Sequence, residues 1–420
     1  MPRCGQPAAN RILFVDDMHA VVVGDSPVRL WGLTPAERIE RQLRGEGIVI
    51  WREGIESSSA NDGLLVLRGD CLYDSRVIRG LAKARKVLLE GDVDGRRMPL
   101  AARVAVEQIA AVEAWLRGSV PPGALADSTV VNVEQVAKGY EAGLKKLDRP
   151  FVLPVTDERR AALEQLTFSG AYKGVTDLVT KWLWPVPAQW VTRACVRLRM
   201  TPNQVTAASL VLVCVAGALF AHGEFGWGLV AGWIMTFLDT VDGKLARVTV
   251  TSTKLGNIFD HGIDLVHPPF WYIAWGIGLA LASPAIGGMP LLTIYWIILA
   301  GYIGGRLCEG AFQLWIARFS IFTWRPFDSW FRLIAARRNP NMIMLTVSLV
   351  ADRPDLGLLA VAAWTSLSTG LLLVRLLLAA RAKRGPNPVA SWLSEIGQTV
   401  DESSLAVRVF THAAPAARKA

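Results

Sequence analysis

Four aspartates lie within one stretch of 26 residues, between apolar blocks: Asp239, Asp242, Asp260 and Asp264. The first two are three residues apart and the last two are four residues apart, so each pair shares one face of a helix. Near a bilayer, carboxylates without a cation repel one another and cost several kcal/mol each to desolvate. Oxygen-only ligation selects hard divalent ions, so the stretch predicts a Mg²⁺ or Mn²⁺ site.

The residues around the aspartates suit phosphate chemistry. Gly243, Ala246 and Gly256 are small where two helices, or a helix and a nucleotide, must approach closely. Arg247 carries a guanidinium that can bind a phosphate through two hydrogen bonds. Together with metal ions on a diphosphate and a spare carboxylate as base, these groups form a set for phosphoryl transfer.

This stretch resembles the signature of the CDP-alcohol phosphatidyltransferase family, DxxDGxxAR, eight residues, then GxxxDxxxD. All eight fixed positions are present between Asp239 and Asp264. The resemblance implies that Asp239, Asp242 and Asp260 hold two divalent ions, and that Asp264 lies near the second ion and acts as the base. Other residues would bind the CDP moiety: Gly243, Ala246, Arg247, Gly256 and, in a Thr-Pro-Asn element at 201–203, Asn203. Thr201 and Pro202 are equally well explained as the start of a helix.

The resemblance also implies a reaction. An alcohol attacks the β-phosphorus of a CDP-linked donor, CMP leaves, and a phosphodiester forms, as in phospholipid or polyol-phosphate biosynthesis. Two donors remain open, CDP-diacylglycerol in the bilayer and a soluble CDP-polyol. A homodimer is carried over from the same resemblance. A metal-ion transporter is the non-enzymatic alternative, because carboxylates in membrane helices also mark ion pathways.

Residues 201–383 are expected to form a domain of six membrane-spanning helices. The apolar runs lie at 203–222, 227–247, 257–282, 288–313, 341–352 and 356–380, and the fifth is short. Arg and Lys gather in the connections near 193–199, 244–254, 318–338 and 381–384. This asymmetry predicts an integral protein of a bacterial inner or plasma membrane, with both termini and the aspartates on the cytoplasmic side.

Basic residues inside and beside the fourth span are candidates for binding the alcohol acceptor. Arg306 lies in an apolar run, with Glu309 one turn on as its expected partner. Arg337 and Arg338 could receive the anionic group of a phosphorylated acceptor.

Two flanking segments complete the C-terminal part. Residues 126–200 are expected to hold a linker and amphipathic helices at the membrane interface, because Trp182, Trp184 and Trp190 alternate with basic residues. The alternative is a helix packed on the soluble domain. Residues 384–420, with Pro, Ala and Ser, predict a flexible cytoplasmic tail.

Residues 1–125 predict a soluble α/β domain with a Rossmann-type sheet. The strand candidates are ILFV, AVVVG, IVIW, LLVLRG and KVLLE, and the helix candidates are TPAERIERQLR, DSRVIRGLAKA and RVAVEQIAAVEAWLR. Thr34, Pro35 and Glu37 mark one helix start.

This domain is similar to sugar-nucleotide nucleotidyltransferases in degenerate form. Gly24, Arg29 and Asp70 would be remnants of its nucleotide site, whereas Ala36 stands where the family has lysine. The combination resembles bifunctional inositol-phosphate cytidylyltransferase and di-myo-inositol phosphate phosphate synthase proteins. If the domain is active, the chain makes its own CDP-polyol from CTP.

Composition restricts the alternatives. The 52% hydrophobic content is high for a wholly soluble protein, and the net charge is +9. Because the basic residues lie beside apolar blocks, they indicate lipid headgroups rather than nucleic acid. The five cysteines are odd in number and form no CxxC pair, which argues against a disulfide framework or a zinc knuckle. The first residues lack the pattern of a signal peptide.

Overall fold

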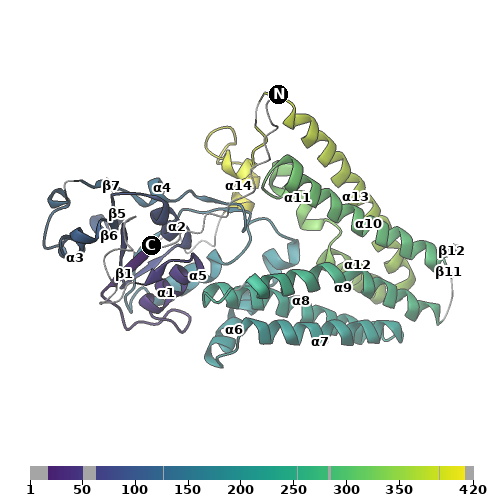
Figure 1. The fold of residues 1–420 in the computed structure, drawn as a ribbon. Helices are drawn as coiled ribbons and strands as arrows, with labels where there is room; N and C mark the ends of the chain where they lie inside the picture. The colour runs from purple at the N-terminus through teal and green to yellow at the C-terminus, as the bar shows by residue number, and fades with distance from the viewer. Residues whose placement is uncertain are drawn as a thin grey trace, which may run out of the picture. The chain divides into compact units, whose positions relative to one another are not determined.

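The computed structural model describes residues 18–50, 63–125, 127–252, 254–281, 285–386 and 388–411, and within these the side chains of 254–255 and 257–261 are not described. By its internal contacts the chain divides into two compact units. The first contains Met1–Gly139 and Arg149–Leu163, and the second contains Tyr140–Asp148 and Glu164–Ala420. The expected strand at ILFV lies outside the described residues. Figure 1 labels the elements of both units.

The first unit is built on a mixed sheet of strands in the order β2-β1-β3-β6-β5-β7. Its strands are β1 (His19–Val23), β2 (Val49–Ile50), β3 (Leu64–Arg68), β5 (Val87–Val93), β6 (Arg96–Val104) and β7 (Thr129–Val131). β1 is parallel to both β2 and β3, whereas β6 runs antiparallel to both of its neighbours. The expected α/β class is confirmed, with a mixed sheet in place of an all-parallel one. A separate pair, β4 (Cys71–Tyr73) and β10 (Val152–Pro154), is antiparallel.

Helices α1 (Pro35–Gly45), α2 (Ser75–Lys83) and α3 (Ile109–Leu116) belong to this unit. The predicted start of α1 is confirmed, because the Thr34 hydroxyl accepts from the Glu37 N–H and the Glu37 side chain accepts from the Thr34 N–H. The predicted helix at 103–117 is wrong at its start. There the chain is still in β6, whose Arg103 and Val104 pair with Leu65 and Leu64 of β3.

The second unit is helical after a small hairpin of β8 (Tyr140–Glu141) and β9 (Lys146–Leu147). α5 (Arg160–Gly170) leads into it. Its helices are a π-helix at Val179–Leu183, α6 (Pro185–Arg197), α7 (Pro202–Ala221), α8 (Phe225–Val248), α9 (Lys254–Ala280), α10 (Leu291–Ala311), α11 (Pro326–Ile334), α12 (Arg338–Val350) and α13 (Pro354–Lys383). α7 lies along α8 and α9, and α10 lies along α13 (Figure 1). α12 packs against both α13 and α8, so it connects the two groups of helices.

Three helical segments of the described chain are long and apolar enough to cross a membrane: Pro202–Ala221, Leu291–Ile316 and Pro354–Lys383. Three of the six expected spans are therefore supported by length and composition. α8 and α9 are long, at 24 and 27 residues, but α8 carries Asp239, Asp242 and Lys244 towards its end. α12 has only 13 residues, fewer than the ~20 that a spanning helix needs.

The C-terminal segment differs from expectation. Residues 388–411 are packed, with a short 3₁₀ helix at Trp392–Ser394 and α14 (Leu405–Phe410). Trp392 is 0% exposed, and its indole N–H donates to the Ser329 hydroxyl at 2.9 Å. Phe410 lies against Trp330 and Trp392. The prediction of a flexible tail is thus wrong for 388–411, because its few large apolar residues find a buried site that composition does not reveal.

Candidate active site

Two of the four aspartates meet at one cation. Asp239 lies near the end of α8 and Asp264 lies in α9, and each accepts a hydrogen bond from Arg338 at the start of α12. The distances are 2.5 Å from Arg338 Nη2 to Asp239 Oδ2 and 2.5 Å from Arg338 Nη1 to Asp264 Oδ1. The Asp239 and Arg338 side chains are about equally buried, whereas 42% of the Asp264 side chain is exposed. Three helices therefore hold two carboxylates at one positive charge.

Asp242 is held separately by α7. It is 3% exposed, and its Oδ2 accepts a hydrogen bond from the Thr206 hydroxyl at 2.6 Å. Thr206 lies one turn into α7, which begins with a capping box between Thr201 and Gln204 and with Pro202 in its first turn. Thr201 and Pro202 therefore act in helix initiation, and Asn203 next to them is exposed. α7 positions Asp242 through a hydroxyl that no motif marked.

The backbone oxygen of Ala171, in the segment before α6, accepts hydrogen bonds from two basic side chains of the aspartate stretch. Lys244 Nζ and Arg247 Nη1 each donate to the Ala171 oxygen at 3.1 Å. The Lys244 ammonium also lies 3.5 Å from the centre of the Tyr172 ring. A Cβ on Gly243 would lie 3.4 Å from Arg247 Nη1, so the missing side chain leaves room for this guanidinium. Arg247 therefore lies on the same face of α8 as Gly243, which is one turn earlier in the helix.

Lys173 follows in the same segment. Burial lowers the pKa of its ammonium, and the positive charges of Arg247 and Arg332 lower it further, while Asp264 and Asp239 act in the opposite direction. The lysine is therefore within electrostatic range of both carboxylates that Arg338 binds. Neither Lys173 nor Thr206 belongs to the aspartate motif, and only their positions in the fold identify them.

The remaining predicted metal ligand, Asp260, lies in α9 among residues whose side chains are not described. Among the described side chains, no three of His, Cys, Asp or Glu gather at one point. Asp239 and Asp264, whose side chains are described, offer the oxygen ligands that hard divalent cations prefer. They lie close enough together to bind the same guanidinium, that of Arg338. Ala246 and Gly256 lie in α8 and α9, and both are half-buried.

The arginines expected to bind the alcohol acceptor have other partners than the sequence indicated. Glu309 forms its ion pair with Arg337 instead of Arg306. Arg306 donates to the Tyr302 hydroxyl at 3.2 Å and lies over the same ring. Arg338, as described above, bridges two aspartates. Pairing partners in different helices cannot be read from spacing along one helix, and this explains the difference.

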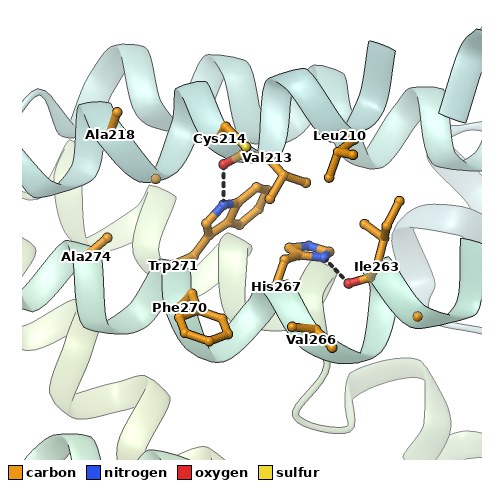
Figure 2. A pocket seen from close by; sticks show the side chains of 12 residues that line it. Leu210, Val213, Cys214, Ala218, Ile263, Val266, His267, Phe270, Trp271 and Ala274 are labelled. Atoms are coloured by element: carbon orange, nitrogen blue, oxygen red, sulfur yellow. Dashed lines mark hydrogen bonds between the residues drawn. The ribbon is translucent and has the colours of Figure 1, made fainter. Parts of the chain in front are cut away.

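An apolar cavity of about 730 Å³ opens between α7 and α9. It is lined by Leu210, Val213, Cys214, Gly217, Ala218, Gly262, Ile263, Val266, His267, Phe270, Trp271 and Ala274. Figure 2 shows two hydrogen bonds of its lining: Trp271 Nε1 donates to the Val213 oxygen at 2.9 Å, and His267 Nδ1 lies 2.7 Å from the Ile263 oxygen. His267 Nε2 has no hydrogen-bond partner among the described residues. Gly262 and Ile263 directly precede Asp264, so the cavity begins beside the aspartates.

In the first unit, the carboxyl ends of β1 and β3 bring the expected nucleotide remnants to one edge of the sheet. A Cβ on Gly69 would lie 1.9 Å from the Gly24 oxygen, so the two glycines allow this close approach. Asp70 accepts from Arg68 Nη2 at 2.6 Å. Burial acts to raise the pKa of Asp70, but the hydrogen bond and the positive charge of Arg68 outweigh it and leave this pKa below its usual range. Arg29 pairs with Glu37 at 3.0 Å.

Comparison with known proteins concerns the C-terminal part of the chain. Residues 199–400 match the CDP-alcohol phosphatidyltransferase family. The chain is 31% identical over 147 residues to cholinephosphotransferase 1 of Gallus gallus, covering 32% of this chain and 42% of the relative. It is 26% identical over 132 residues to phosphatidylinositol phosphate synthase of Mycolicibacterium smegmatis, covering 31% of this chain and 60% of the relative.

Human ethanolaminephosphotransferase 1 is 27% identical over 121 residues, covering 25% of this chain and 30% of the relative. The chain thus spans well under two thirds of the length of these relatives. The family is placed on the C-terminal region, which is that of an integral membrane protein with helical spans, and the N-terminal region is assigned to no family.

Proposed function

We propose that this protein is a membrane CDP-alcohol phosphotransferase. The observation that carries the proposal is the convergence of Asp239 and Asp264, from two helices, on one cation within the family's sequence motif. An acceptor hydroxyl attacks the β-phosphorus of the CDP-linked donor. The new P–O bond replaces the bond from the β-phosphorus to the bridging oxygen, which leaves with CMP, and the hydroxyl proton passes to Asp264.

Different side chains of the protein are proposed to have different roles in this reaction. Asp264, the more exposed carboxylate of the pair, is placed to accept the proton and release it to water. Arg247, with Gly243 and Gly256 beside it, is proposed to bind the diphosphate of the donor. Asp239, Asp242, Asp260 and Asp264 are the residues proposed to hold two Mg²⁺ or Mn²⁺ ions. These ions would supply charge stabilisation on the phosphate oxygens.

We propose that one of the two substrates is a lipid. The apolar cavity beside Asp264 suits a hydrocarbon chain, since most of its lining residues are apolar and both Trp271 Nε1 and His267 Nδ1 already have backbone partners. This favours CDP-diacylglycerol over a soluble CDP-polyol as the donor.

The orientation in the membrane is also a proposal. We place six helices in the bilayer, with α8, α9 and α12 completing the three candidate spans, and both termini and the aspartates on the cytoplasmic side of a bacterial plasma membrane. The π-helix at Val179–Leu183 and α6 would lie at the interface, because Trp182 in the first and Trp190 in the second are 58% and 67% exposed. A homodimer stays a prediction.

The test is CMP release by the purified full-length protein in lipid nanodiscs with Mg²⁺. CDP-diacylglycerol and CDP-polyol donors are offered with inositol, glycerol and their phosphates as acceptors. The proposal expects CMP with at least one pair, and none after chelation with EDTA. If no donor and acceptor pair releases CMP, while the protein moves divalent ions across liposomes, the transporter alternative replaces it.

A bifunctional enzyme remains the second candidate for the N-terminal region. Its support is the placement of Gly24 and Asp70 at one sheet edge. Against it, Asp70 is bound by Arg68 and the expected lysine is Ala36. Pyrophosphate release from CTP and a polyol phosphate would establish this activity, and its absence would leave the transferase alone.

A further inference from the structure

Three cations surround one buried aromatic ring in the second unit. Lys145 Nζ lies 5.9 Å from the centre of the Phe322 ring, and the guanidinium carbons of Arg332 and Arg337 lie 5.5 Å and 5.6 Å from it. Phe322 itself is 1% exposed. The three charges come from the β8–β9 hairpin, from α11 and from the residue before α12, so the fold gathers them from distant parts of the sequence.

Only one of these charges has an acidic partner. Arg337 pairs with Glu309. In the part of the chain that the structure describes, neither Lys145 nor Arg332 lies within ion-pair distance of a carboxylate, and Arg332 Nη1 is buried without a hydrogen-bond partner. Burial lowers the pKa of Arg332, and the negative charge of Asp177 offsets this only in part. Asp177 itself accepts hydrogen bonds from Thr180 and Asn339.

Lys173 extends this group towards the aspartates. The charges of Arg247 and Arg332 and those of Asp264 and Asp239 act on its ammonium in opposite directions. The described structure gives it no ion pair. Burial also lowers the pKa of Lys145, with Arg332 and Lys173 as its strongest charged neighbours. Lys145, Lys173 and Arg332 therefore form one group of unpaired cations, which we call the basic cluster.

The backbone holds the two lysines in fixed positions. The Gly174 N–H donates to the Leu144 oxygen at 3.0 Å, and the Val175 N–H donates to the Lys145 oxygen at 3.2 Å. A Cβ on Gly174 would lie 2.6 Å from the Lys145 oxygen, so only glycine permits this contact without displacement. The site is thus preformed, which reduces the entropy cost of binding a ligand.

Lys145, Lys173 and Arg332 are half-buried, and like charges gathered away from full contact with water are disfavoured without a counter-ion, so the basic cluster suits an anion. A phosphate monoester carries close to two negative charges and enough oxygens to accept from two lysines and one arginine at once. We propose that Lys145, Lys173 and Arg332 bind the phosphate group of a phosphorylated alcohol acceptor, which rests on the proposed phosphotransferase function. Lys173 would then set the acceptor's hydroxyl towards Asp264.

Both lysines precede residue 199, where the family match begins. Acceptor choice in this protein would therefore depend on a segment outside the transferase region. Arg337 and Arg338 are already bound to carboxylates, so we reassign the acceptor phosphate from them to the basic cluster.

The test uses Lys145→Gln, Lys173→Gln and Arg332→Gln in the full-length protein in nanodiscs. Arg325→Gln is the control, because Arg325 is an exposed cation of the same basic connection and pairs with Glu395. Steady-state CMP release is measured with CDP-diacylglycerol and with glycerol 3-phosphate, myo-inositol 1-phosphate and the two unphosphorylated alcohols. Melting temperature is measured with and without inorganic phosphate.

We expect each cluster variant to raise the KM for the phosphorylated acceptor by ~10-fold or more, with the KM for the donor unchanged. Arg332→Lys should restore part of the loss. Phosphate should raise the melting temperature of the wild type and the control, but less in the cluster variants. An unchanged acceptor KM overturns the proposal, even where phosphate still stabilises the protein, because that marks a site for free phosphate only.

A preference for the unphosphorylated alcohols also overturns the proposal. In both of these cases the wild type still releases CMP, so the transferase function stands. Absence of CMP from every donor and acceptor pair is instead the failure of that function.

Discussion

Asp239 on α8 and Asp264 on α9 are bound by the same guanidinium, that of Arg338, at 2.5 Å each. Two carboxylates therefore face one guanidinium, with Lys173 as a further cation within electrostatic range of both. This arrangement explains why carboxylates can persist at the ends of long apolar helices. It also leaves the junction able to attract a divalent cation or a metal-bound diphosphate.

Replacement of Asp264 by Asn should separate binding from turnover. The amide keeps the shape of the side chain but cannot accept the hydroxyl proton, so kcat should fall by ~10²–10⁴-fold while the donor still binds. CMP release and equilibrium binding of a CDP donor measure the two quantities. Asp355→Asn, at an exposed pair with Arg353, is the control. Wild-type turnover in Asp264→Asn would assign the base to another group.

Removal of the Arg338 charge should make the protein more dependent on metal. In Arg338→Gln, Asp239 and Asp264 lose their shared partner, and their repulsion lowers stability until another cation replaces it. We expect a lower melting temperature in EDTA and a larger increase on adding Mg²⁺ than in the wild type. Arg353→Gln, an exposed arginine, should show neither change. Equal Mg²⁺ shifts in Arg338→Gln and the wild type would contradict this account.

The Thr206 hydroxyl should affect the Mg²⁺ requirement of the reaction, because it holds Asp242 in position. Thr206→Val removes a hydrogen bond to a buried carboxylate, which costs ~1.5–3 kcal/mol, and it loosens a residue proposed to bind metal. We predict a 10- to 100-fold higher Mg²⁺ concentration for half-maximal CMP release. Thr365→Val is the matched control, because the buried Thr365 hydroxyl has no hydrogen-bond partner among the residues that the structure describes. The same Mg²⁺ requirement in both variants would show that Thr206 is only a packing residue.

The C-terminal segment should stabilise the membrane unit. Trp392→Ala leaves a cavity in a buried aromatic cluster and removes the hydrogen bond that the Ser329 hydroxyl accepts, so ~3–5 kcal/mol of the free energy of unfolding should be lost. Thermal unfolding in nanodiscs measures it against Trp182→Ala, whose side chain is mostly exposed. Comparable melting temperatures for the two variants would mean that the segment is loosely attached after all.

Local sequence patterns predicted those elements of the structure that are determined by residues close together in the sequence. The cap of α1 at Thr34 and the apolar runs of β1, β3 and β5 were found because neighbouring residues determine them. β6 was missed at Arg103, since its pairing with β3 is a long-range contact that overrides a helical pattern. The packing of Trp392 was missed for the same reason.

The aspartate motif located the candidate site, because fixed residue types at fixed spacing are the signal. The partners of those residues were not predictable in the same way. Arg338 reaches Asp239 across 99 positions, and Lys244 reaches Ala171 across 73 positions. Such partners follow only from the three-dimensional arrangement of α8, α9, α12 and the segment before α6.

The most direct test of the central claim is a double-mutant cycle on Asp239 and Asp264, read as Mg²⁺-dependent CMP release by Asp239→Asn, Asp264→Asn and the double variant. If the two carboxylates act as one centre, each single change should remove most of the activity, and the double variant should lose little more than the worse single variant. Losses that multiply, or Mg²⁺-stimulated activity that survives in Asp239→Asn, would contradict a shared catalytic centre.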